Sequence, residues 1–351
     1  MHHQSLSLNL TEQSLNSSQE LDQRLQNPCV LITGATGFVG SRLAGFLSAQ
    51  FPGMQLRLAV RHRPDELEVP GILPVGSIEV VGDINPHTNW ADALDGVDVA
   101  IHLAARVHVM NDVALDPLEE YRNANTFATI HLAQEAAKAG VKRFIYLSSI
   151  KVNGEETSPG QSYSEDSTPA PIDPYGVSKW EAELGLEKVC AQTGMEFVII
   201  RPPLIYGPGV KANFQKLMGL VAKGMPLPLG ATQNQRSMLA LDNLVSFIAE
   251  VMTNPLAANQ RFLLSDGEDL STSQLLRLIA QGMGKSIWLL PVPAFILRAA
   301  AQVLGASAAA DRLLGSLQID SSKARQLLHW QPPLSAEEGI TITAQSYLKN
   351  S

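Results

Sequence analysis

The stretch Val30-Leu31-Ile32-Thr33-Gly34-Ala35-Thr36-Gly37-Phe38-Val39-Gly40 joins an apolar, strand-like run to glycines in the spacing G-x-x-G-x-x-G. A helical pattern of apolar residues follows it directly. The first glycine of such a turn permits a sharp reversal, the second lets the backbone approach a pyrophosphate, and the third lets the helix pack close to the strand. The stretch therefore predicts a dinucleotide-binding unit, although a glycine triad alone also occurs in turns without a ligand.

Size and composition are those of a globular protein. The chain has 351 residues, of which 45% are hydrophobic and 17% charged, and its net charge of −8 gives no reason to expect nucleic acid. Cys29 and Cys190 show no metal-ligand spacing, so we predict neither a disulfide nor a metal site and expect a cytoplasmic protein. The polar residues 1–27 lack the pattern of a signal peptide and are predicted to be a disordered or variable tail. The apolar stretch 287–304 is interrupted by prolines and Arg298, which favours a packed or surface helix over an integral membrane segment.

Strands and helices alternate from residue 28 onward. Strand patterns near 55–60, 78–81, 97–103, 144–147 and 197–200 are separated by helical patterns, the longest of them at 117–140 and 175–193. This alternation predicts an α/β fold with a Rossmann-type, doubly wound parallel sheet over residues 28–203. Residues 204–351 are predicted to form a smaller, mainly helical substrate-binding lobe, with one strand near 261–265 returning to the sheet.

Two arginines follow the second predicted strand. A fold of this kind that prefers NAD places an acid here, to accept hydrogen bonds from the ribose 2′-hydroxyl, whereas an arginine accommodates a 2′-phosphate. Arg61 and Arg63 therefore favour NADP(H) as the cofactor, with NAD(H) as the alternative.

Tyr175 and Lys179 are four residues apart on a predicted helix and so share one face. A phenol is a poor acid or base at neutral pH, and a neighbouring ammonium lowers its pKa. Ser149 ends a parallel strand at the sheet edge where ligands bind in such folds. Its hydroxyl is placed to hydrogen-bond the same substrate oxygen. The three residues predict proton exchange with a substrate hydroxyl.

With these motifs in place, the chain resembles the extended short-chain dehydrogenases/reductases, in the NAD-dependent epimerase/dehydratase family. The resemblance rests on the glycine turn, Gly82-Asp83-Ile84, His102-Leu103-Ala104-Ala105, Tyr121 through Asn125, Leu147-Ser148-Ser149, Tyr175 through Lys179 and Arg201-Pro202. It implies a catalytic set of Ser149, Tyr175 and Lys179. It also implies cofactor contacts from Gly34, Gly37, Phe38, Val39, Gly40, Asp83, Ile84, Leu103, Ala104, Ala105, Asn125, Tyr175, Lys179 and Pro202.

The resemblance further implies a nucleotide-sugar substrate, held mainly by the C-terminal part. Arg236 matches the arginine that pairs with the nucleotide diphosphate in this family, and a guanidinium suits bidentate phosphate contact. Lys211 and Asn213 fall where the family's substrate loop lies, while Phe214 fits the core as well as it fits a substrate contact. A UDP-sugar as partner and a homodimer are expected from the resemblance alone.

Departures from the family's sequence pattern reduce the number of candidate reactions. Ile150-Lys151 follows Ser149 where 4,6-dehydratases carry Asp-Glu, which speaks against dehydration. Arg61, together with Leu204 at a position where many epimerases have Asn, favours a reductase. Motif detail also resembles the bacterial branch that reduces UDP-4-keto-6-deoxy-N-acetylglucosamine to UDP-N-acetylquinovosamine for surface polysaccharides. We therefore expect an NADPH-dependent C4 reductase. The alternatives are a UDP-glucose or UDP-N-acetylglucosamine 4-epimerase and, from another class, a non-catalytic NADP(H) sensor.

Overall fold

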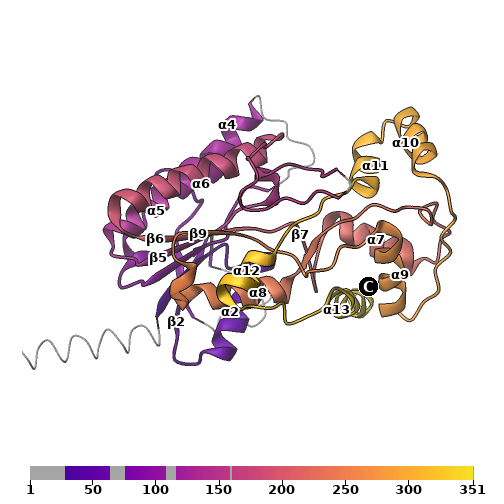
Figure 1. Cartoon of the computed structure of the whole chain (residues 1–351). Helices are drawn as coiled ribbons and strands as arrows, with labels where there is room; N and C mark the ends of the chain where they lie inside the picture. The colour runs from indigo at the N-terminus through magenta and orange to yellow at the C-terminus, as the bar shows by residue number, and fades with distance from the viewer. Residues whose placement is uncertain (1–27, 64–75, 108–115, 159, 351) are drawn as a thin grey trace, which may run out of the picture.

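A parallel sheet of seven strands lies at the centre of the molecule, in the order β3-β2-β1-β4-β5-β6-β9 (Figure 1). The computed structural model describes residues 28–63, 76–107, 116–158 and 160–350, so the predicted N-terminal tail lies outside the described residues. The strand order runs outward in both directions from β1, which makes the sheet doubly wound, as predicted. The strands are β1 Cys29–Thr33, β2 Gln55–Val60, β3 Ser77–Val80, β4 Val99–His102, β5 Arg143–Leu147, β6 Glu196–Arg201 and β9 Gln260–Leu263.

Alternation along the strands divides the core between the two faces of the sheet. In β1, Val30 and Ile32 belong to one apolar cluster, and Leu31 belongs to the cluster on the other face. The first cluster is covered by α2 Phe38–Gln50, α8 Leu241–Thr253 and α12 Ser322–Leu328. The second is covered by α3 Ala91–Leu94, α5 Ala128–Lys138 and α6 Pro174–Thr193.

The long helix predicted over 117–140 is present but is not uniform. It consists of α4 Pro117–Tyr121, the π-helical segment η1 Arg122–Phe127 and α5. A π segment holds wider turns than an α-helix and so changes the direction in which its side chains point. Asn125 lies in this segment, and its side chain is buried between the β4 loop and α6.

The C-terminal part forms a third apolar cluster beside the carboxyl ends of the strands. Its parallel pair β7–β8 packs with α7, α9 and α13, and α10 and α11 project at its far end (Figure 1). From the same part of the chain, α8, β9 and α12 return to the sheet, so residues 204–351 contribute to both cores. No helix among the described residues combines the length and the hydropathy needed to cross a bilayer. The elements not yet given are η2 Ile150–Val152, β7 Leu204–Tyr206, α7 Ala212–Ala222, β8 Met238–Ala240, η3 Pro255–Ala257, α9 Thr272–Gly282, α10 Ala294–Val303, α11 Ser307–Leu314 and α13 Ala336–Lys349.

Two glycines let β1, α2 and the β4 loop approach one another closely. Gly34 has a φ of +69°, and a Cβ there would lie 2.9 Å from the backbone nitrogen of Ala104. A Cβ on Gly40 would lie 2.1 Å from the carbonyl oxygen of Gly34. Backbone atoms cannot move aside as a flexible side chain can. The turn therefore requires glycine at both positions.

We predict that Gly40→Ala destabilises the protein by roughly 1–3 kcal/mol, because the methyl group overlaps the Gly34 carbonyl. Gly45 lies on the same helix α2 and is the matched control, since a Cβ there meets no atom within 4 Å. Gly45→Ala should leave stability unchanged or raise it by about 0.5–1 kcal/mol. Chemical denaturation of both variants measures the difference, and equal effects would contradict the packing described for the turn.

Candidate functional site

A cavity of about 920 Å³ opens at the carboxyl ends of the central strands, between the sheet and the C-terminal part. This is the edge at which ligands bind in open α/β sheets. The cavity wall brings together residues from the glycine turn, the ends of β2, β4, β5 and β6 and the first turns of α6. Of the predicted site residues, it includes Gly34, Gly37, Phe38, Val39, Gly40, Arg61, Asp83, Ile84, Leu103, Ala104, Ala105, Ser149, Tyr175, Lys179 and Pro202.

Other predicted site residues lie outside the cavity wall. Arg63 is exposed beyond the end of β2. Asn125 lies behind the wall, where its side chain accepts a hydrogen bond from Arg106 N (2.8 Å) and donates to Arg106 O (3.1 Å) and Ser178 Oγ (3.1 Å). Asn125 thus holds the loop after β4 against helix α6 and supports the cavity from behind.

The glycine turn fits a dinucleotide. Gly37 precedes the first residue of α2 and offers no side-chain cap, so the first backbone N–H groups of the helix are left to a ligand. These groups and the helix dipole favour an anion such as a pyrophosphate. A Cβ at Gly34 or Gly40 would overlap backbone atoms, so glycine at both positions keeps the turn compact at the cavity wall. The residues present therefore suit the group that the sequence predicts.

Arg61 does not stand alone at the end of β2. Its Nε lies 2.6 Å from Oδ1 of Asp83, which follows β3, and both side chains are exposed at the cavity. The pair thus presents a carboxylate as well as a guanidinium to a ribose. A 2′-phosphate would be attracted by the Arg61 guanidinium and repelled by the Asp83 carboxylate.

Tyr175 enters the cavity because of how α6 begins. Asp173 caps the helix by accepting a hydrogen bond from Gly176 N at 2.7 Å, and Pro174 occupies the first turn. A Cβ on Gly176 would lie 2.8 Å from the carbonyl oxygen of Lys151, so glycine allows the helix to start close to the Ser149 loop. Lys151 forms ion pairs with Asp173 and Glu155, which ties that loop to the start of the helix.

Lys179 lies one helical turn beyond Tyr175 and is 2% exposed. Its Nζ donates a hydrogen bond to Leu147 O (2.8 Å) and lies 5.9 Å from the centroid of the Tyr175 ring. Burial lowers the pKa of Lys179 to about 7, while the charge of Glu183 acts in the opposite direction. The side chain of Lys179 therefore exchanges between the ammonium and the neutral amine near neutral pH.

The sequence analysis expected the ammonium to lower the pKa of Tyr175, and in this respect the expectation is wrong for the protein alone. Burial raises the pKa of Tyr175 above its ordinary value, and a hydrogen bond with Ser149 only partly opposes that effect. Ser149 itself accepts a hydrogen bond from Lys151 N (3.2 Å) at the start of η2. Desolvation is the largest effect, and the negative charge of Asp173 further disfavours the phenolate.

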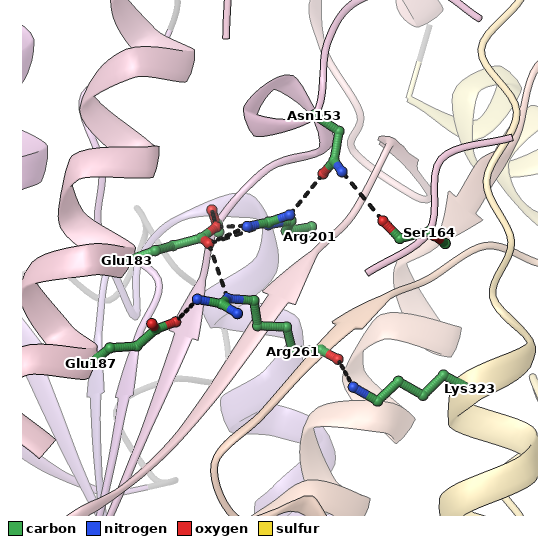
Figure 2. Close-up of polar contacts among 8 residues, drawn as sticks. Asn153, Ser164, Glu183, Glu187, Arg201, Arg261 and Lys323 are labelled. Atoms are coloured by element: carbon green, nitrogen blue, oxygen red, sulfur yellow. Dashed lines mark hydrogen bonds and ion pairs between the residues drawn. The ribbon is translucent and has the colours of Figure 1, made fainter. Parts of the chain in front are cut away.

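A buried ion pair lies directly behind these residues, and the sequence analysis missed it. Glu183, on α6, is 0% exposed and Arg201, at the end of β6, is 1% exposed. Arg201 donates to the Glu183 carboxylate through Nε (3.0 Å) and Nη2 (2.6 Å), and through Nη1 to Asn153 Oδ1 (3.0 Å), as Figure 2 shows. Glu183 also accepts a hydrogen bond from the Ser148 hydroxyl, next to Ser149.

The network extends to the edge of the sheet through Arg261 on β9. Arg261 forms ion pairs with Glu187 and, at 3.8 Å, with Glu183, and its backbone oxygen accepts a hydrogen bond from Lys323 of α12 (2.9 Å) (Figure 2). A signal for the network was present in the sequence. Glu183 follows Lys179 by one turn, and an Arg at the end of an apolar strand must find a partner when buried.

The residues predicted to contact substrate are spread over the C-terminal part. Lys211 and Asn213 are exposed at the start of α7, while Phe214 is buried and stacks on Tyr206 with ring centroids 5.4 Å apart. Phe214 is therefore a core residue. Arg236 is half-buried before β8 and donates to Gly315 O at 3.1 Å. Within the described ranges, no cluster of His, Cys, Asp or Glu is arranged to hold a metal ion.

Comparison with known proteins gives the site its context. The sequence model of the NAD dependent epimerase/dehydratase family matches residues 30–264. A UDP-glucose 4-epimerase of Vibrio cholerae is 45% identical over 321 residues, covering 91% of this chain and 95% of the relative. An N-acetyl-α-D-glucosaminyl-diphospho-ditrans,octacis-undecaprenol 4-epimerase of Escherichia coli O157:H7 is 31% identical and covers 74% of each chain.

Solved structures agree on the fold. The UDP-glucuronic acid 4-epimerase of Bacillus cereus, in complex with NAD, has a TM-score of 0.72 at 21% identity, over 92% of this chain and 99% of its own. A UDP-glucose 4-epimerase of Thermotoga maritima, with UDP-glucose, has the same score, identity and coverage. The dTDP-glucose 4,6-dehydratase of Bacillus anthracis scores 0.72 at 17% identity over 92% of this chain and 97% of its own. The fold is thus common to different reactions.

These comparisons correct the reaction expected from the sequence. We expected a C4 keto-sugar reductase toward UDP-N-acetylquinovosamine, and that expectation is wrong. The 45% identical relative of Vibrio cholerae is named a 4-epimerase, and so is the 31% identical relative of Escherichia coli O157:H7. The reductase expectation rested on Arg61 and Leu204. Arg61 follows β2 and pairs with Asp83, and Leu204 on β7 is 47% exposed and is not among the residues of the cavity wall. Both reactions need Ser149, Tyr175 and Lys179, so these three residues do not distinguish them.

We predict that Glu183→Gln destabilises the protein by about 3 kcal/mol, because it leaves the Arg201 guanidinium buried without a counter-charge. Glu187 lies one turn further along α6 and its ion pair with Arg261 is partly exposed, so Glu187→Gln is the matched control. It should cost less than about 1 kcal/mol. Urea unfolding measures both, and a loss of similar size in the two variants would contradict the account of the buried pair.

Proposed function

The chain belongs to the NAD dependent epimerase/dehydratase family, and from this premise we propose that it interconverts the C4 epimers of a UDP-sugar. The observation that carries the proposal is the 45% identity to a UDP-glucose 4-epimerase over 91% of the chain. The geometry supports it, because the glycine turn and Ser149, Tyr175 and Lys179 border one cavity. Epimerisation removes hydrogen from the C4 carbinol and returns it to the opposite face, with no net gain or loss of electrons.

The chain's own residues would handle the proton of the C4 hydroxyl. Tyr175 takes this proton as the carbonyl forms and returns it when the carbinol is restored. Ser149 hydrogen-bonds the same oxygen and holds it in reach. A dinucleotide bound at the glycine turn supplies the hydride acceptor, and its oxidised ring carries a positive charge. Lys179, whose Nζ lies 5.9 Å from the centroid of the Tyr175 ring, would add its own charge beside the phenol when protonated and so favour the phenolate.

The identity of the dinucleotide is a separate question. Arg61 supports NADP(H), whereas its partner Asp83 supplies the carboxylate that suits the 2′-hydroxyl of NAD(H). Structural neighbours were solved with NAD. We propose that the site accepts both forms and that Arg61 gives NADP(H) its advantage. An epimerase tolerates either form, since the 2′-phosphate lies on the adenosine half of the cofactor, away from the ring that accepts the hydride.

A second candidate substrate carries the sugar on a polyprenyl diphosphate. The 31% identical relative is named for N-acetylglucosamine on diphospho-undecaprenol, which shares its diphosphate with a UDP-sugar. One observation favours this candidate, namely that helix α10 turns apolar side chains to the solvent. Both kinds of substrate present a hexose on a diphosphate, so assays of N-acetylglucosamine on the two carriers in parallel decide between them.

Purified protein supplied with UDP-N-acetylglucosamine or UDP-glucose, and no added reductant, should form the C4 epimer. Tyr175→Phe should lower the turnover by about 100-fold or more, because the proton acceptor is lost, while dinucleotide binding persists. Tyr347→Phe, on α13 away from the cavity, should keep wild-type turnover. Chromatography of the sugar nucleotides follows the reaction. No epimer from either sugar, or full activity of Tyr175→Phe, would refute the proposal.

The cofactor preference is open to a direct binding measurement. Arg61→Ala should weaken NADP(H) binding about tenfold, because a charge-assisted hydrogen bond to the 2′-phosphate is lost, and should change NAD(H) binding less. Arg57→Ala, on the same strand β2 outside the cavity wall, is the control and should change neither affinity. Isothermal titration measures the four affinities, and equal losses for both dinucleotides in Arg61→Ala would overturn the preference.

A further inference from the structure

Helix α10 is apolar and yet none of its residues is buried. It lies with α11 at the end of the C-terminal part farthest from β2 (Figure 1). The exposed side chains of α10 and of its two flanks form a surface that we call the apolar tip. Among its members, Trp288 is 71%, Phe295 72% and Val303 87% exposed. The apolar tip consists of Trp288, Leu290, Phe295, Ile296, Val303 and Leu304.

The helical period shows that α10 turns its apolar face outward. Ala294 and Leu297 contact the apolar cluster of the C-terminal part, which fixes the inner face of the helix. At about 100° per residue, positions 295, 296, 299, 300 and 303 fall on the opposite half, and all of them are apolar. Arg298 and Gln302 fall at the boundary between the two halves. An ordinary surface helix has the reverse arrangement, with its polar residues facing the solvent.

The segment before α10 adds to the same surface. Leu290 N donates to Leu227 O (2.8 Å) and Leu227 N donates to Trp288 O (2.9 Å), so the segment runs beside residues 225–229. Leu227 and Leu289 pack inward against the apolar cluster. Alternation then points Trp288 and Leu290 outward. Met225, at the start of the neighbouring segment, is 49% exposed.

The charges of the apolar tip and its flanks are mainly cationic, although the whole chain carries −8. Between residues 286 and 310 the single charged residue is Arg298, which is exposed. Lys285 and Lys223 are also exposed at its edge, where the Lys285 ammonium donates to Ala222 O, at the end of α7, at 2.5 Å. On the neighbouring helix α11, the exposed carboxylate Asp311 is followed directly by the exposed cation Arg312, so the cations outnumber the carboxylates that a negatively charged surface would meet here.

We propose that the apolar tip docks on the surface of an anionic lipid bilayer, with α10 lying in the plane of the interface. Helices that bind this way have a continuous apolar face bordered by cations and often carry Trp at the boundary. A second copy of the chain is a poorer occupant, because a two-fold contact would bring Arg298, Lys223 and Lys285 of each copy near those of the other. The inference goes beyond the proposed sugar chemistry and does not rest on it.

Co-sedimentation of the full chain with vesicles tests the proposal. The wild type should sediment with vesicles of equal parts phosphatidylglycerol and phosphatidylcholine, and less with pure phosphatidylcholine. A variant with Phe295→Gln, Ile296→Gln, Val303→Gln and Leu304→Gln should lose at least about tenfold in partition, since its apolar surface is removed. The matched control carries Leu256→Gln and Leu348→Gln, at exposed apolar residues away from the apolar tip, and should bind as the wild type does.

The remaining readouts separate docking from folding and from self-association. The thermal unfolding midpoint and the UDP-sugar activity of the four-fold variant should match the wild type, because no cavity residue is changed. Two results would overturn the proposal: the wild type stays in the supernatant with anionic vesicles, or the four-fold variant sediments as the wild type does. If the first result is found and the substitutions also lower the mass of the protein in light scattering, the apolar tip is assigned to a second copy.

Discussion

The ion pair between Glu183 and Arg201 joins the parts of the molecule that must stay in register for the site to exist. One partner lies on α6, one turn beyond Lys179, and the other ends β6. The same carboxylate accepts from Ser148, and the same guanidinium reaches Asn153, so the strand end at Ser149 is held from two sides. With both charges fully buried, the pair has no solvent to replace a lost partner. The position of Tyr175 relative to Ser149 therefore depends on it.

Around this pair, the site is built from close backbone contacts. Glycine at position 40 lets α2 approach the β1 turn, and glycine at position 176 lets α6 start near the carbonyl of Lys151. The first contact sets the glycine turn at the cavity wall, and the second brings the phenol of Tyr175 to the same cavity. The backbone contacts thus position the side chains of the site, and burial sets the proton affinities of Tyr175 and Lys179. Burial acts oppositely on the two groups, raising the pKa of Tyr175 and lowering that of Lys179 to about 7.

The sequence was sufficient to predict the sheet, the glycine turn and the meeting of Ser149, Tyr175 and Lys179, because each depends on local period or on the shared edge of parallel strands. The sequence did not reveal which charged side chains lie beside one another in the folded protein. Arg61 and Arg63 suggested a cationic site for a 2′-phosphate, but Asp83 lies beside Arg61, 22 residues later in the chain and adjacent through the pairing of β2 with β3. The pKa of Tyr175 depends on burial, which no residue spacing reveals. The reaction was misjudged for the related reason that oxidation and reduction at C4 use the same side chains.

In the proposed epimerisation, the hydrogen removed from C4 of the sugar returns to C4 of the same sugar. Epimerisation of a UDP-hexose carrying deuterium at C4, in ordinary water and without added reductant, measures this directly by mass spectrometry and NMR. The product should keep its deuterium at C4 while its C4 configuration is inverted. Loss of the deuterium to solvent, or inversion that requires a stoichiometric supply of reduced dinucleotide, would contradict the proposed epimerisation.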